Sequence, residues 1–250
     1  MVKFGAVSLP SVQGVQEGHP RVKQEVPLPG RSWSYRRDRG GQGVSFTIHG
    51  IIHPADQTVR DALTALADGT ARILDLEESA YTVLEKCFRY QTGPSWTDNT
   101  SESQSPGGTP FTLLGASTDY TYFGHREKFN KLIFDLQTIG NYGARTWQYS
   151  DGFGGWKTLT PDSDNTSGFT QDGIVAFTPP SDWKQDLVNG VSSKFWVRVS
   201  VASVTVAATV NQIQLNLVYN CIMLDPQFSH LVENYNWITY SAVVLQQENP

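Results

Sequence analysis

Short runs of alternating apolar and polar residues dominate the middle of the chain, over residues 111–199. The segments DYTYFG, KLIFDL, WQYS and KFWVRV carry aromatic or aliphatic side chains at alternate positions, and Gly, Asp, Asn, Ser or Pro separate the segments. A period of two is typical of short antiparallel strands that bury one face. This stretch holds four of the seven tryptophans, which favours a core of its own. We predict a β-sandwich over residues 111–212.

Strand and helix patterns are mixed in the first ninety residues. GVSFTIHGII (43–52) alternates and predicts a strand, whereas residues 56–68 carry apolar side chains at helical spacing and end at Gly69, a typical residue after a helix. ARILDLE (71–77) and YTVLEKCFRY (81–90) predict two more strands. We therefore expect one short helix among strands in this part of the chain.

The N-terminal segment is less regular. Residues 1–30 contain four prolines and little periodicity. We expect a short strand over residues 3–7 and then an extended arm, of the kind that a neighbouring subunit orders.

The composition changes between residues 91 and 110. QTGPSWTDNTSESQSPGGTP is rich in Ser, Thr, Gly and Pro and has almost no aliphatic side chains. This composition is typical of a linker or a long exposed loop. We predict that residues 91–110 lead into the β-sandwich.

The last strand pattern, NYNWITYSAVVLQQ (234–247), is too short to be a domain. It requires a partner earlier in the chain, and the first ninety residues provide one. We predict a mainly β protein in which residues 1–90 and 215–250 form one split domain. In that domain we expect Trp237 to be packed inside, with the sandwich inserted near residues 111–212.

Charge and motifs narrow the range of functions. Charged residues make up 17% of the chain, below the roughly 25% of average soluble domains, and the net charge is −5. General nucleic-acid binders are usually basic, so direct nucleic-acid binding is not expected. The two cysteines cannot supply a four-ligand zinc site, and we interpret both as buried thiols. We find no catalytic motif, and we expect neither enzymatic activity nor a cofactor or metal.

The sequence shows neither a membrane-spanning pattern nor an export signal. No apolar run reaches the roughly 20 residues that a membrane-spanning helix needs. The N-terminal residues do not resemble a signal peptide. We expect synthesis in the cytoplasm and no membrane insertion.

Two groups of residues are candidates for binding. Trp147 and Tyr149 alternate in one strand pattern, and Trp156 follows a glycine-rich turn. Exposed aromatic rings beside Asp or Asn stack on sugar rings, which makes these three a candidate ligand platform. The alternative is that they pack in the core, as tryptophans in small sandwiches usually do.

The second group is Arg36, Arg37 and Arg39, which lie near a Gly-Gly turn. They are either part of a solvated loop or contacts between subunits, because the planar guanidinium suits bidentate pairing at interfaces.

The split layout resembles the belt domain of distal tail proteins from phages and archaeal viruses. The features that carry the resemblance are the strand with Gly50-Ile51-Ile52, the short helix, the following strand pair and the C-terminal strand with a tryptophan. The resemblance implies a homo-hexameric ring at the tail tip or baseplate of the virion, between the tail tube protein and the tail hub protein. It also makes Arg36, Arg37 and Arg39 candidates for subunit or tube contacts.

The middle of the chain resembles a galactose-binding-like jelly-roll domain. DYTYFG, KLIFDL, WQYSDGFGGWKTL, GFTQDGIVAFTPPSDW and FWVRVSV carry this resemblance. In a tail protein, such a sandwich would project outward from the ring and would bind a host surface glycan, hold a receptor-binding protein or brace the next ring. A stand-alone carbohydrate-binding or adhesion protein is the alternative, but it leaves the split domain unexplained.

Overall fold

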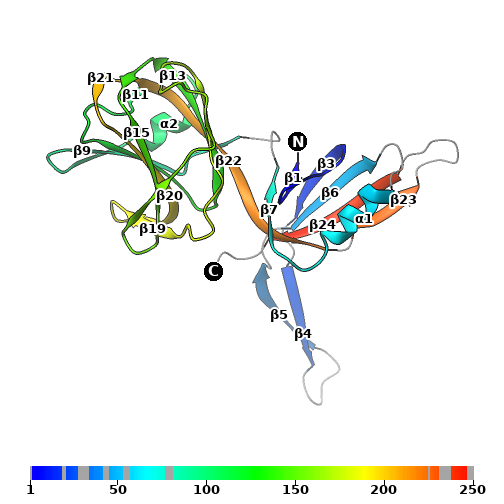
Figure 1. Cartoon of the computed structure of the whole chain (residues 1–250). Helices are drawn as coiled ribbons and strands as arrows, with labels where there is room; N and C mark the ends of the chain where they lie inside the picture. Colours follow the sequence, from blue (N-terminus) through cyan, green and yellow to red (C-terminus); the bar gives the residue numbers. More distant parts are fainter. Residues whose placement is uncertain are drawn as a thin grey trace. The chain divides into compact units, whose positions relative to one another are not determined.

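The computed structural model describes residues 2–18, 21–27, 34–41, 45–52, 57–76, 81–224, 226–230 and 238–246. Strands predominate, every pairing defined between them is antiparallel, and the described residues contain two helices. The prediction of a mainly β chain is therefore confirmed. The chain divides into a first unit, Met1–Glu77 with Tyr219–Pro250, and a second unit, Glu78–Val218 (Figure 1).

The first unit is organised on two long strands from opposite ends of the chain. β6 (Ser45–Ile52) pairs along its whole length with β24 (Ile238–Gln246), and β3 (Val12–Gly18) pairs with the other edge of β6 (Figure 1). The prediction that the C-terminal strand pairs within the first ninety residues is confirmed. β24 also pairs with β23 (Gln227–His230) and with the end of β22 (Thr209–Met223).

Alternation explains the core of this unit. In β6 the side chains of Phe46, Ile48 and Ile52 are buried, and β24 buries every second residue from Ile238 to Val244. Helix α1 (Gln57–Ala65) adds the buried Leu63 to the same cluster, so the predicted short helix is confirmed. Trp237, which we predicted to be inside, lies outside the described residues.

The N-terminal segment differs from the extended arm that the sequence led us to expect. β1 (Lys3–Phe4) pairs with β2 (Val7–Ser8) and with β7 (Arg72–Asp75), while β4 (Arg21–Pro27) pairs with β5 (Ser34–Gly41). Backbone hydrogen bonds hold these strands together. Such pairing does not require apolar side chains at alternate positions. The expected strand over residues 3–7 corresponds to β1 and β2, whereas the apolar pattern did not predict β4 or β5.

The second unit is a sandwich of two sheets, each named here for a central strand. The β13 sheet contains β17 (Ser163–Asp164), β18 (Gly173–Ala176), β13 (Phe129–Thr138) and β22, with β8 (Thr82–Val83) and β11 (Phe111–Thr112) on β22. The β20 sheet runs in the order β10 (Ser95–Asp98), β9 (Lys86–Gln91), β12 (Tyr120–His125), β20 (Val191–Val201), β15 (Arg145–Ser150) and β16 (Trp156–Leu159), with β19 (Gln185–Val188) also on β20. A short pair, β14 (Asn141–Tyr142) with β21 (Val204–Val206), completes the strands.

Aromatic side chains from the two sheets meet between them. The Phe134 ring of β13 lies with its centroid 5.8 Å from that of Phe123 in β12 and 6.4 Å from that of Trp147 in β15. Trp183 is 2% exposed and lies 5.1 Å from Phe129 and 5.5 Å from Phe195. These contacts establish the predicted β-sandwich.

Residues 91–110 are part of the second unit and not a linker that leads into it. They include β10 and helix α2 (Thr100–Gln104), and Gln104 Nε2 donates to the Leu84 carbonyl over 2.6 Å. Asn99 is buried, and its N–H donates to the Cys87 carbonyl. The polar composition serves these bonds and turns, which is why it resembles a linker. The chain enters the second unit at Glu78 and leaves it after Val218, so both predicted boundaries are shifted.

We predict that a fragment of residues 78–218 folds alone, because it contains the strand pairings that build both sheets of the second unit. A fragment of residues 108–212, which matches the sequence-based boundaries, lacks β9 and β10 and exposes an edge of β12. Urea titrations followed by far-UV circular dichroism should show a cooperative transition for the first fragment and none for the second. Equal cooperativity in the two fragments would contradict this assignment.

A second prediction concerns Gly50, which lies opposite Tyr240 across the β6–β24 ladder. A Cβ at this position would overlap the Tyr240 ring, which is 1% exposed and donates from its hydroxyl to the Pro10 carbonyl. Gly50→Ala should lower the free energy of unfolding by roughly 1–3 kcal/mol through overpacking. Without the overlap, Ala would be expected to stabilise a strand.

Denaturant unfolding of Gly50→Ala, Tyr240→Leu and the double variant tests the mechanism. Gly50→Ala should cost less in the Tyr240→Leu background, since a smaller side chain relieves the overlap. A cost that is the same in both backgrounds would show that the ring is not the cause.

Candidate functional site

The outer face of the β20 sheet, turned away from the sandwich core, carries a second group of aromatic rings. We call it the aromatic face; it consists of Phe88, Tyr90, Trp96, Tyr120, Tyr122, Trp156 and Trp196. The strands alternate so that Cys87, Phe123 and Val197, next to these residues, belong to the core between the sheets. Both faces of this sheet are therefore apolar.

The registers of the strands bring the rings together. Tyr122 lies opposite Phe88 on one side and opposite Arg198 on the other, and Arg198 lies opposite Gln148. Trp196 is fully buried, and its partner across the ladder is Gly124. A Cβ at Gly124 would overlap the Trp196 indole, so this glycine leaves the space in which the ring lies.

Arg198 holds the centre of the aromatic face. Its guanidinium carbon lies 4.2 Å from the Trp156 ring centroid and 4.5 Å from that of Tyr120, which are cation–π distances. Its Nε donates to Gln148 Oε1 over 2.9 Å, and its Nη1 donates to the Tyr122 hydroxyl over 3.3 Å. The charge of Arg198 is thus engaged by the protein itself.

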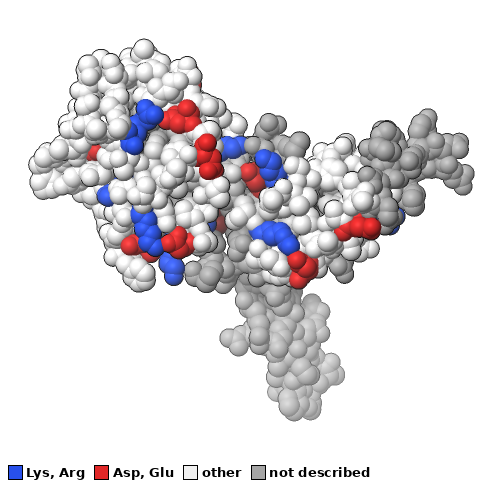
Figure 2. Space-filling model, in the orientation of Figure 1, with Lys and Arg blue, Asp and Glu red and all other residues white. Residues whose placement is uncertain are grey.

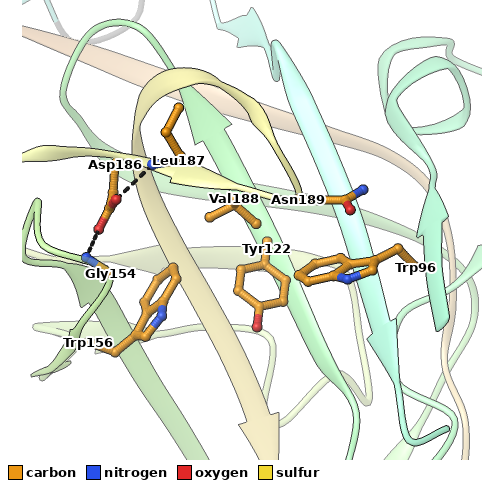
Figure 3. Close-up of a pocket in the computed structure, with 8 residues that line it drawn as sticks. All are labelled: Trp96, Tyr122, Gly154, Trp156, Asp186, Leu187, Val188 and Asn189. Atoms are coloured by element: carbon orange, nitrogen blue, oxygen red, sulfur yellow. Dashed lines mark hydrogen bonds between the residues drawn. The ribbon is translucent and has the colours of Figure 1, made fainter. Parts of the chain in front are cut away.

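Three of the rings line a hollow of about 180 Å³ (Figure 3). Tyr122, 6% exposed, lies between Trp96 and Trp156, with centroid distances of 5.2 Å and 5.4 Å to the two indoles. The remaining lining comes from Gly154 and from residues 186–189. Burial raises the pKa of the Tyr122 phenol, although the hydrogen bond from Arg198 acts in the other direction. The phenol therefore stays neutral at physiological pH.

Hydrogen bonds fix the two loops beside the hollow. Asp186 accepts from the Gly154 N–H over 2.6 Å and from the Leu187 N–H over 2.7 Å (Figure 3). The Trp196 indole donates to the Asp186 carbonyl over 2.9 Å, which ties this loop to the sheet. Asp151 accepts from the N–H groups of Phe153 and Gly155. The loops are therefore held in place without a ligand.

The structure places the three residues of the predicted ligand platform on opposite faces of the β20 sheet. Trp147 and Tyr149 are 4% and 7% exposed and pack in the core between the sheets, so their assignment to a platform is wrong. Trp156 faces the other way and lines the hollow, so its assignment to a ligand platform stays a prediction. Strand alternation places Trp147 and Tyr149 on one face of β15, and nothing in the sequence indicates which face that is.

Sequence reasoning missed Trp96, Tyr122 and Asn189. Trp96 lies in the segment that resembles a linker, and Tyr122 lies in a run, YTYFG, that has apolar residues at adjacent positions. The run itself indicated this arrangement. It has aromatic residues at both odd and even positions, so both faces of the strand carry rings, as in a sheet with two apolar faces. Asn189-Gly190, with φ of 51° and 72°, forms the tight turn between β19 and β20.

The three candidate contact residues Arg36, Arg37 and Arg39 lie in β5. Arg36 pairs with Glu25 and Arg37 with Gln24 in the β4–β5 ladder, and their side chains lie outside the described parts. These arginines therefore belong to a β-ribbon of the first unit.

A group of charges at Glu85 is the nearest approach to a catalytic arrangement. Glu85 contacts Lys194 Nζ, lies 3.3 Å from Arg126 Nε and lies 3.8 Å from the Nε2 of His125. Burial lowers the pKa of His125, which is 3% exposed and accepts the Glu127 N–H at Nδ1. Burial raises the pKa of Glu85, but the bond from Lys194 and the neighbouring charges leave it below its usual range. The cluster is an ion-pair network that anchors β9, β12 and β20.

The two cysteines lie in the interior of the described parts. Cys87 and Cys221 are buried, as predicted, and burial raises the pKa of the Cys87 thiol, which leaves it a poor nucleophile. Within the described ranges, no cluster of three or more His, Cys, Asp or Glu side chains is placed to hold a metal ion. On the face in Figure 2, most of the described surface is uncharged, and basic residues lie beside acidic ones.

Two further findings bear on function. No helix in the described residues is long and apolar enough to cross a membrane. Compared with known proteins, the chain matches no family model and no curated protein sequence.

The buried His125 predicts a pH dependence. The unfolded chain takes up a proton on this side chain near pH 6.5, and the folded chain does so only at lower pH. The second unit should therefore lose stability as the pH falls below about 6.5, and the lowered pKa of Glu85 adds to the loss nearer pH 4. Urea midpoints at pH 8, 6.5 and 5.5, followed by tryptophan fluorescence, measure the loss.

His125→Gln should flatten the profile between pH 8 and 5.5, because His125 is the only histidine in the sequence of the second unit. His49→Gln is the control, since His49 is an exposed histidine of the first unit. If His125→Gln keeps the full decline, the buried imidazole is not its source.

Proposed function

We propose that this chain is a non-catalytic structural protein of a virion tail tip. Its first unit would form a homo-hexameric ring between the tail tube protein and the tail hub protein. Its second unit would be displayed as a module that binds a host surface glycan or a receptor-binding protein. The proposal combines the resemblance of the split layout to distal tail proteins with the construction of the two units.

The observation that carries the proposal is that the first unit is built from both ends of the chain. β24 completes its sheet beside β6, while Glu78–Val218 form a unit with its own cores. A unit closed in this way keeps its fold whatever is inserted into it. This suits a constant ring-forming part that displays a binding part.

Open strand edges support assembly. Among the described strands, β3 pairs only with β6, and β4 and β5 pair only with each other. A free edge accepts a strand from another chain, and an isolated two-stranded ribbon is marginally stable in water. Closure into a ring satisfies such edges, and Arg36, Arg37 and Arg39 on the β4–β5 ribbon are candidates for contacts with a neighbouring subunit or the tube.

The use of the polar groups supports a role without catalysis. Glu85 and His125 serve an ion-pair network, and Asp186 fixes two loops. A stand-alone carbohydrate-binding or adhesion protein is the second candidate, and the aromatic hollow favours it. This second candidate function leaves the first unit and its β4–β5 ribbon without a role.

We expect the purified chain to form six-fold rings, alone or with the tube and hub proteins. Light scattering coupled to size-exclusion chromatography gives the mass, and electron microscopy gives the symmetry. The triple variant Arg36→Glu, Arg37→Glu, Arg39→Glu should reduce ring formation at least tenfold and leave the circular dichroism spectrum unchanged. Lys184→Glu, at an exposed position of the second unit, is the control for charge reversal and should assemble normally.

A stable trimer, or a location on the capsid of purified particles, would contradict the tail-tip assignment. Hydrolysis of a glycan by the purified chain would contradict the non-catalytic role.

A further inference from the structure

We propose that the hollow between Trp96, Tyr122 and Trp156 binds a single neutral pyranose ring of a glycan. This inference rests on the proposed function for its setting, because it gives the displayed module its ligand class. Its geometry comes from the second unit alone. The site differs from the platform that the sequence indicated, since only Trp156 is common to both.

The size of the hollow suits one sugar ring. Its volume of about 180 Å³ is below the roughly 300–1,000 Å³ of sites for drug-sized ligands. Figure 3 shows Trp156 and Trp96 on either side of Tyr122, with residues 186–189 along one side. A ligand in this hollow contacts two indoles and a phenol, while the rest of the glycan extends into solvent.

The aromatic lining requires an apolar ligand face. The indoles are only partly buried, and Tyr122 forms the floor beneath them. Trp and Tyr rings combine a large apolar surface with little conformational freedom, so they bind a flat, weakly polar face at low entropic cost. The C–H groups of a pyranose form such a face.

The charges exclude ionic ligands. A quaternary ammonium group also favours aromatic cages, but the Arg198 guanidinium already lies 4.2 Å from the Trp156 centroid and 5.9 Å from that of Tyr122. Its fixed positive charge repels a second cation. An anion meets the Asp186 carboxylate at the edge of the hollow, and Arg198 is engaged by Gln148 and three rings. A neutral ligand remains.

Neutral hydrogen-bonding groups are available for hydroxyls. The indole N–H groups of Trp96 and Trp156 and the amide of Asn189 make no hydrogen bond to any other described residue. Each indole is a donor, and the amide is both donor and acceptor. Rings for a C–H face combined with uncharged donors and an acceptor are the chemistry that recognises a sugar.

The experiment measures binding to the full chain by saturation-transfer difference NMR. The neutral probes are methyl β-D-galactopyranoside, methyl α-D-glucopyranoside and N-acetylglucosamine, and the ionic probes are choline chloride and N-acetylneuraminic acid. We expect saturation transfer to the ring protons of at least one neutral probe at millimolar concentration. Neither ionic probe should receive saturation.

Two variants test whether the sugar binds in the hollow. Trp156→Ala should weaken the binding at least tenfold. Asn189→Asp should weaken it several-fold without unfolding, because Asp also tolerates the positive φ of this turn and only removes the amide donor. Phe153→Ala is the matched control, since Phe153 is 88% exposed, lies outside the hollow and should leave affinity unchanged. Circular dichroism confirms that each variant is folded.

The proposal is overturned if no neutral sugar receives saturation, if choline binds better than every sugar, or if folded Trp156→Ala and Asn189→Asp both bind as the parent does. Ring formation is measured separately by mass and microscopy. A chain that binds sugar but stays monomeric both alone and with the tube and hub proteins refutes only the tail-tip ring, and a ring that binds no sugar refutes only this inference.

Discussion

The pairing of β24 with β6 is the constraint on which the organisation of this chain depends. It joins residues at opposite ends of the sequence in an unbroken ladder from Ile52 with Ile238 to Ser45 with Leu245. Closing so long a loop has an entropic cost that grows only slowly with its length, and the inserted unit folds on its own core. The backbone ladder and the buried alternate residues of both strands offset that cost. The pairing makes the second unit an insertion.

Within the second unit, the β20 sheet is apolar on both faces. One face packs on the β13 sheet and completes the sandwich core. The other bears its own rings around Arg198, with Trp196 seated against Gly124. A sheet that needs only one buried face for stability has no structural requirement for Trp96 and Trp156 on its other side. Their position beside a hollow with fixed loops is the reason to assign them to binding.

The polar groups of the unit fall into two classes. Glu85, Lys194 and His125 saturate one another, and Asp186 and Asp151 hold loop backbone. The groups left open at the hollow are neutral donors and one amide. The neutral groups and rings at the hollow suit the recognition of hydroxyls.

The sequence by itself determined where apolar residues recur at strand spacing and where they recur at helix spacing. The alternation of residues 45–52, the helical spacing near Leu63 and the strand patterns of the sandwich specify their elements, because side-chain direction follows directly from backbone geometry. The requirement that an isolated C-terminal strand find a distant partner was also evident.

Only the tertiary structure decided which face of each strand is inside. In a sheet with two apolar faces, alternation cannot distinguish Trp147 from Trp156, and only packing against the β13 sheet does so. Residues 91–110 and the N-terminal strands likewise needed the tertiary structure. Hydrogen bonds to other segments, made by strand backbone and by the Gln104 side chain, hold them without an apolar pattern.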